Sequence, residues 1–108
     1  MEKLVQDFIQ AANAPDIEAA LGLFADDAMI DDRSVGDTFA GKAGIGKYLE
    51  AYFVRYHTVT ALVSLESVGD RHAKAHVDFT GDFGHETGVL EIRTNAGGLI
   101  ERIDADLD

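Results

Sequence analysis

The sequence contains no cysteine, which excludes a disulfide framework, a thiolate metal site and a cysteine nucleophile. It has no basic run, and 9 Lys and Arg stand against 20 Asp and Glu, for a formal net charge of -11. That sign disfavours nucleic acid phosphates and anionic lipid as partners. No apolar run approaches the roughly 20 residues that span a bilayer, and the N-terminus is unlike a secretory signal. We therefore expect a cytoplasmic protein that binds neither nucleic acid nor membrane.

The composition is that of a folded protein. Apolar residues make up 46% of the chain and charged residues 27%, and the length is 108 residues. This balance is typical of globular proteins, and the length suits one hydrophobic core rather than two. We expect residues 1–108 to form a single domain.

Apolar residues recur with the period of a helix in three places. The first face runs from Leu4 to Ala12, and the second from Ile17 to Phe24, after Pro15 and Asp16. The third is a wide apolar and aromatic face that begins at Ile45 and ends near Tyr56. These segments predict three helices in the first half of the chain.

The pattern changes to alternation after His57. Strands are predicted over residues 59–66, 73–80 and 86–94, with a last strand that ends near Asp106 and a brief early one over residues 28–30. Gly69 and Asp70 supply the turn between the first two strands of this meander. Helices followed by a meander predict an α+β fold with an antiparallel sheet.

The stretch LFADDAMIDD, residues 23–32, followed by Gly41 and the Ile45 helix, resembles the SnoaL-like and ketosteroid-isomerase-like family of the nuclear-transport-factor-two-like superfamily. The opening LVQDFIQAANAPD and the late NAGGLIERID extend the resemblance over essentially the whole chain. It implies one SnoaL-like domain, in which a curved antiparallel sheet wraps around three N-terminal helices as a cone or cystatin-like roll. It also implies a pocket inside the cone and a homodimer formed through the outer face of the sheet.

Asp32 falls where ketosteroid isomerases carry their aspartate base, so the resemblance implies that role here. On an apolar wall, desolvation disfavours the charged carboxylate and should raise its proton affinity, as a general base requires. A second interpretation is a turn residue, because Asp31 to Ser34 is also typical of a strand that leaves into a loop. Asp31 should point to the opposite face of its strand.

The residues that polarise a ketosteroid are absent from the matching positions. Phe8 stands in place of the tyrosine, Leu49 in place of the supporting tyrosine, and Leu90 or Val89 in place of the second acid. Loss of one oxyanion donor typically costs on the order of a hundredfold to a thousandfold in rate. Steroid isomerisation itself is therefore not expected.

His76 and Asp78 form a second candidate group, because residues two apart share one face of a strand. The segment VDFT resembles the strand of limonene-epoxide-hydrolase-like members that carries pocket-facing polar residues. His76 would then supply an acid and Asp78 would orient it. Those hydrolases also need an acid on the last strand, where Ala105 stands. The alternative is that His76 and Asp78 are the solvated face of a half-buried strand.

The predicted site combines these groups with an apolar pocket. Its expected lining residues are Phe8, Phe24, Met29, Tyr48, Tyr52 and Leu90. The favoured function is a cofactor-independent isomerase or cyclase that acts on a small apolar molecule by proton transfer at Asp32, assisted by His76 and Asp78. No metal or organic cofactor is implied. The alternatives are an epoxide-hydrolase-like hydrolase and a non-catalytic ligand-binding or dimerisation module of the same fold.

Overall fold

The computed structural model describes residues 1–108 and contains helices in its first half and a sheet that spans both halves. Its elements are α1 (Glu2–Asn13), α2 (Ile17–Leu21), β1 (Phe24–Asp32), β2 (Asp37–Ala40), α3 (Gly41–Leu49), the π-helical turn η1 (Glu50–Val54), β3 (Val59–Gly69), β4 (His72–Gly81), β5 (Gly84–Thr94) and β6 (Ile100–Leu107). None of the helices is long and apolar enough to cross a membrane.

All three predicted helices are present, although α3 begins at Gly41, ahead of the predicted face that starts at Ile45. The α1 face that is buried includes Val5, Phe8 and Ile9. α2 begins after Asp16, whose carboxylate accepts the Ala19 N–H at 3.0 Å and so caps the helix. Phe24, expected on the second helix, instead opens β1, because the chain leaves the helix at Gly22.

The six strands form one sheet in the order β2-β1-β6-β5-β4-β3. The predicted meander of β3, β4, β5 and β6 is antiparallel throughout. The prediction of a wholly antiparallel sheet is wrong, because β1 pairs with β6 in parallel and the sheet is mixed. This pairing brings Asp32 beside Ala105.

Strand β2 was not predicted. It has only four residues, three of them exposed, and it pairs with β1 across the turn between Asp32 and Asp37. So short and solvated a segment lacks the alternation by which a half-buried strand is recognised.

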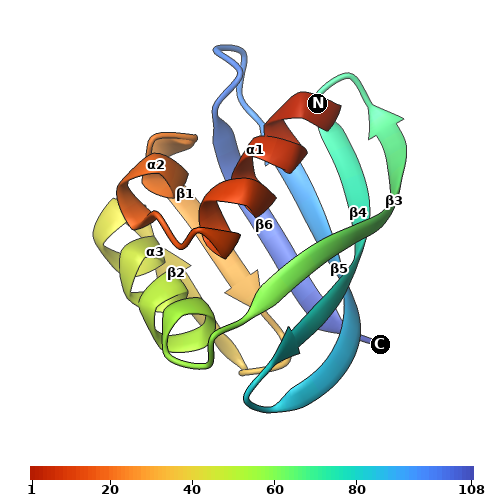
Figure 1. Cartoon of the computed structure of the whole chain (residues 1–108). Coiled ribbons are helices and arrows are strands. Elements are labelled where there is room, and N and C mark those ends of the chain that lie inside the picture. The colour runs from red at the N-terminus through yellow and green to blue at the C-terminus, as the bar shows by residue number, and fades with distance from the viewer.

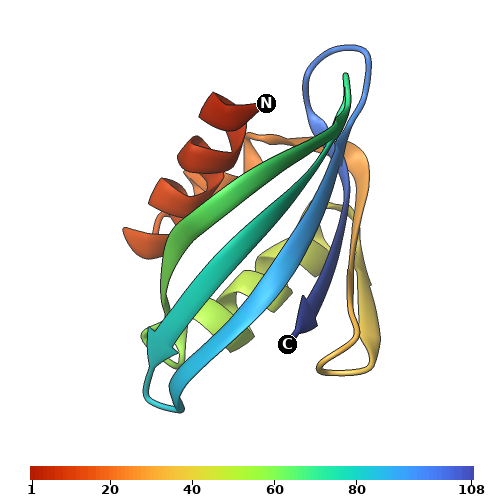
Figure 2. The same ribbon diagram turned by 90° about the vertical axis from the view of Figure 1, so that its right-hand side faces the viewer.

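The helices cover one face of the sheet, as Figure 1 shows. Figure 2 shows β3, β4 and β5 as long bent strands that curve around the helices. The core fills the space between the two layers, and its largest fully buried side chains include Phe24, Ile45 and Ile92. The predicted α+β cone, a cystatin-like roll, is confirmed.

Candidate functional site

A cavity of about 320 Å³ opens at the end of the cone opposite the start of α1. The elements that line it come together at the lower end of Figure 1. The turn after β1, the α3–η1 helix, and the ends of β4, β5 and β6 surround it. Eight of the twelve lining residues are hydrophobic. They are Asp32, Ser34, Val35, Tyr48, Tyr52, Phe53, Tyr56, Thr58, Phe79, Phe83, Glu86 and Leu107. The size and the lining suit a small, largely apolar molecule.

Asp32 is the last residue of β1, lines the cavity and is 7% exposed. Its Oδ1 accepts hydrogen bonds from the Ser34 N–H at 2.9 Å and the Ser34 hydroxyl at 2.6 Å. Its Oδ2 accepts one from the Tyr48 hydroxyl at 2.5 Å. Asp32 is therefore both the turn residue and the pocket residue that the sequence suggested, while its role as a base remains a prediction.

Tyr48 comes from the last turn of α3 and is buried against other aromatic rings. Its ring centroid lies 4.9 Å from that of Phe39 and 5.3 Å from that of Tyr52. Burial raises the pKa of Tyr48 well above its usual range, and the nearby charge of Asp32 and the hydrogen bond to it raise that pKa further. Tyr48 is accordingly a neutral O–H donor over the whole physiological pH range.

The turn η1 and the residues that follow it position further aromatic side chains in the cavity wall. A π-helical turn holds more residues than an α-helical one, and such turns recur at functional sites. It places Tyr52, Phe53 and Tyr56 along the same wall as Tyr48. Thr58 stabilises the end of this helix, because its hydroxyl donates a hydrogen bond of 2.8 Å to the Tyr52 carbonyl oxygen.

Of the predicted lining residues, only Tyr48 and Tyr52 line the cavity. Phe8, Phe24 and Leu90 are buried in the core, where Phe8 packs edge-on against Phe24 with ring centroids 5.7 Å apart. Their side chains fill the deep part of the cone, so the cavity lies nearer its mouth. Met29 faces outward, since it alternates with Ile30 and Asp32 and contacts Arg102.

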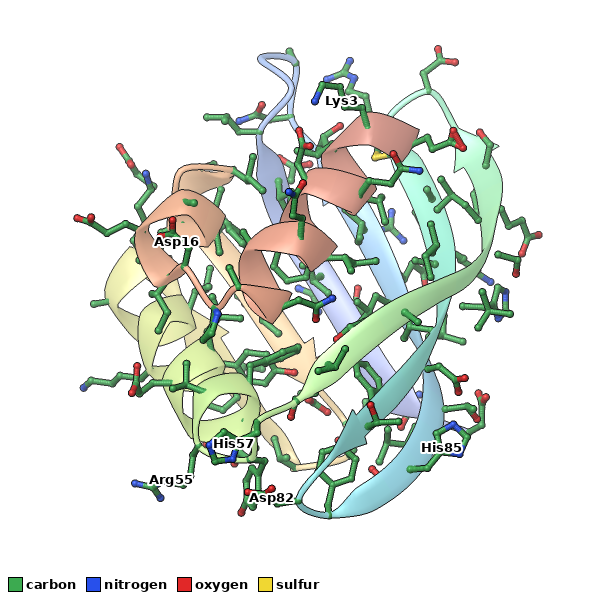
Figure 3. The ribbon with its side chains drawn as sticks, in the orientation of Figure 1. Lys3, Asp16, Arg55, His57, Asp82 and His85 are labelled. Carbon is green, nitrogen blue, oxygen red and sulfur yellow. The ribbon has the colours of Figure 1, made fainter.

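His76 and Asp78 also lie outside the cavity, so the prediction that they face it is wrong. They alternate with Ala75 and Val77, which are buried, and their own side chains are 45% and 39% exposed. His76 approaches Glu66 at 4.0 Å, and Asp78 pairs with His85 at 2.7 Å. Figure 3 places His85 beside the β4–β5 end of the sheet, away from α3. The solvated-face interpretation is the one that holds.

The last strand supplies no acid to the cavity. Ala105, which stands where the hydrolases carry their acid, is buried, whereas Asp104 pairs with Arg102. The triad of epoxide-hydrolase-like members is therefore incomplete in this chain. No group of three His, Asp or Glu side chains is close enough to hold a metal ion.

Glu86, Phe79, Phe83, Val35 and Leu107 line the cavity without having been singled out as pocket residues from the sequence. Phe79 could have been found from its place in the alternation of β4. Phe83 lies in the β4–β5 turn, Glu86 lies near the start of β5, and Val35 lies in the turn after β1. The curvature of the whole sheet brings these segments beside η1, so the local spacing of residues in the sequence does not predict that they line the cavity.

Solved structures that share this fold over most of the chain include those of the following three proteins. A candidate ketosteroid isomerase from Kribbella flavida superposes with a TM-score of 0.86 at 18% identity, over 98% of this chain and 76% of that one. RV0760c from Mycobacterium tuberculosis, solved with estradiol-17beta-hemisuccinate, superposes with a TM-score of 0.83 at 23% identity, over 94% of this chain and 88% of that one. A candidate polyketide cyclase from Sinorhizobium meliloti superposes with a TM-score of 0.86 at 21% identity, over 95% of this chain and 93% of that one.

At the level of sequence, curated proteins give no match to the chain. The family model of the SnoaL-like domain matches residues 5–103, which include β1 with Asp32, the whole α3–η1 helix with Tyr48 and Tyr52, and the first half of β6. The chain therefore belongs to the SnoaL-like domain family.

Proposed function

We propose that the chain is an enzyme of the isomerase or cyclase kind that binds a small, largely apolar molecule in this cavity and transfers a proton at Asp32. The observation that carries the proposal is the Asp32 carboxylate, held by three hydrogen bonds at the wall of an aromatic cavity. An isomerase and a cyclase share the same first step, removal of a proton from carbon next to a carbonyl group.

The hydrogen bonds position the carboxylate and leave it able to react. A carboxylate offers about four acceptor sites on its two oxygens. Oδ1 accepts two bonds from Ser34, whereas Oδ2 accepts only the bond from Tyr48. Oδ2 therefore keeps an acceptor site for a proton from the bound molecule.

The proton transfer needs a donor for the oxygen that becomes negative. When Asp32 takes the proton, the electron pair of the C–H bond moves to the carbonyl oxygen and forms an enolate. Tyr52 lines the cavity, and its hydroxyl makes no hydrogen bond within the chain, so it can serve as that donor. Return of the proton to a different carbon completes an isomerisation.

Relatives with this fold support a small-molecule role. RV0760c was solved with a steroid derivative, and the Sinorhizobium meliloti protein is described as a candidate cyclase. Steroid isomerisation itself is not part of the proposal, because Phe8, Leu49 and Leu90 are buried core residues without a donor group.

A second candidate function is a ligand-binding module without catalysis. The observation in its favour is that the N–H and the hydroxyl of Ser34 both donate to Asp32. An Asp that only stabilises a turn makes hydrogen bonds of this kind. Under this alternative the cavity binds its ligand and Asp32 moves no proton.

The exchange of carbon-bound protons tests the two functions. β-Tetralone, a bicyclic ketone, is incubated with the protein in D2O, and loss of its α-proton signals is followed by NMR. We expect the protein to accelerate the exchange and the Asp32→Asn variant to abolish the acceleration. Asp31→Asn is the matched control, because it changes the charge equally on the outer face beside Arg102. Binding of β-tetralone without faster exchange would favour the module.

We also propose that the chain forms a homodimer through the outer face of its sheet. Val59 and Val63 of the edge strand β3 are exposed there, Val63 to 66%, and an exposed apolar edge favours association. Sedimentation velocity of the protein and of the Val63→Glu variant tests this. A monomeric protein at micromolar concentration contradicts it.

A further inference from the structure

The charged residues that line the cavity are both acidic. Asp32 and Glu86 belong to the lining, whereas none of the 9 Lys and Arg and none of the four His does. Arg55 and His57 follow η1 close to the mouth, and Figure 3 shows His57 turned toward Asp82. The cavity thus has negative charge and no positive side chain to balance it.

Asp32 has no cationic partner. Its three hydrogen bonds come from neutral donors, the Ser34 N–H, the Ser34 hydroxyl and the Tyr48 hydroxyl. A charge that is almost wholly buried is costly unless an opposite charge compensates it. A positive charge bound elsewhere in the same cavity would lower this cost, since the chain supplies no cation there.

Glu86 differs from the other carboxylates around the mouth because it has no hydrogen bond and no ion pair. Asp82 pairs with His57 at 2.9 Å and Asp78 with His85 at 2.7 Å. Asp108 accepts a hydrogen bond from Thr87 at 2.8 Å. Glu86, in contrast to Asp78, Asp82 and Asp108, lines the cavity and has no partner within the chain.

Aromatic rings surround these carboxylates. All three tyrosines of the chain and three of its six phenylalanines line the cavity. The faces of aromatic rings are electron-rich and attract ammonium groups, and aromatic cages with acidic residues recognise amines. A neutral apolar ligand would use the rings but would have no need of Glu86.

We propose that the cavity takes a small organic cation, a molecule in which a protonated or quaternary amine is attached to an apolar ring system. The proposal names the ligand class for the cavity of the proposed function and rests on it. The amine lies at the mouth by Glu86, and the apolar body lies along the α3–η1 wall. The net charge of -11 further raises the local concentration of cations.

Three probes that share one ring system test the ligand class. Naphthylmethylamine is a cation at neutral pH, naphthylmethanol is neutral, and naphthoate is an anion. Their affinities for the full chain are measured by fluorescence titration. We expect the amine to bind at least about tenfold more tightly than the alcohol, and naphthoate to bind most weakly.

Two matched variants test the role of Glu86. Glu86→Gln should reduce the preference for the amine over the alcohol by about threefold or more. Glu101→Gln removes the same charge near the opposite end of β6, where Glu101 is exposed and does not line this cavity, and should leave the preference unchanged. An equal loss in both variants would overturn the assignment of Glu86, because it would trace the preference to the net charge alone.

The results separate this inference from the proposed function. If the alcohol binds as tightly as the amine while Asp32→Asn still stops β-tetralone exchange, the cation proposal is wrong and the enzyme proposal stands. If the amine is preferred and no exchange occurs, the cation is the ligand of a binding module. If no naphthalene probe binds and no exchange occurs, both proposals are wrong.

Discussion

The Tyr48 hydroxyl donates a hydrogen bond of 2.5 Å to Oδ2 of Asp32, sixteen residues earlier in the chain. This bond joins α3 to the end of β1, two neighbouring elements that both supply lining residues to the cavity. It also completes the set of neutral donors around Asp32, since Ser34 supplies the other two. The position of the candidate base thus depends on a side chain from a different element.

Tyr48→Phe should destabilise the protein by about 1–3 kcal/mol, because it removes a donor from a buried carboxylate. The free energy of unfolding in urea measures the effect. Tyr56→Phe is the control, since Tyr56 is 41% exposed and its hydroxyl makes no hydrogen bond within the chain. Equal stability of the two variants would show that the Tyr48 bond contributes nothing.

The raised pKa of Tyr48 predicts a loss of stability in alkali. The contribution of Tyr48 is fully present below the unfolded pKa of about 10. It is lost as the pH rises toward the higher folded pKa, because the unfolded chain releases the proton first. Above pH of about 10, the unfolding free energy should fall more steeply than that of Tyr48→Phe, by up to about 1.4 kcal/mol per pH unit. Parallel curves for the two proteins would contradict this.

Asn13→Ala should destabilise the edge strand β3. The Asn13 side chain donates to the Thr60 carbonyl and accepts from the Thr60 N–H, both at 2.8 Å, and so ties α1 to β3. Loss of both bonds should cost about 1–3 kcal/mol and should speed amide exchange at Thr60. Gln10→Ala, at an exposed position of α1 without side-chain hydrogen bonds, serves as the control.

Gly88→Ala should disturb the pairing of β5 with β6. A Cβ at Gly88 would lie 2.5 Å from the Asp106 carbonyl oxygen, a backbone atom that cannot move without shifting the strand. We expect a loss of about 1–3 kcal/mol in unfolding free energy, as for other overpacked sites. Gly69→Ala is the matched strand control, since the nearest atom to its Cβ would be 4.0 Å away. A Gly88→Ala protein as stable as Gly69→Ala would refute the close approach.

Local periodicity predicted most of the elements, because the helices and the long strands each bury one face. It also placed Asp31 on the face opposite Asp32, where it contacts Arg102, since a strand alternates strictly. For His76 and Asp78, simple alternation was right and the resemblance to epoxide hydrolases was misleading, because buried Ala75 and Val77 determine which way the strand faces.

What could not be predicted depends on distant parts of the chain. The parallel pairing of β1 with β6 and the Tyr48–Asp32 bond join segments that no local pattern relates. The depth of the cavity depends on how Phe8 and Phe24 fill the cone, which is a matter of packing volume rather than of residue type. Glu86 could not be predicted as a lining residue either, because its place at the cavity depends on the contact between the β4–β5 turn and the residues after η1.

The pairing of β1 with β6 also orders events during folding. β1 belongs to the first half of the chain, among the helices. Apart from the short β2, its only strand partner is β6, which begins more than 60 residues after the end of β1. Non-local parallel pairing forms slowly, whereas the β3–β4–β5 meander closes through short turns. The cavity is lined by Asp32 at the end of β1 and by Leu107 at the end of β6, so during synthesis on a ribosome it cannot be complete before β6 has emerged.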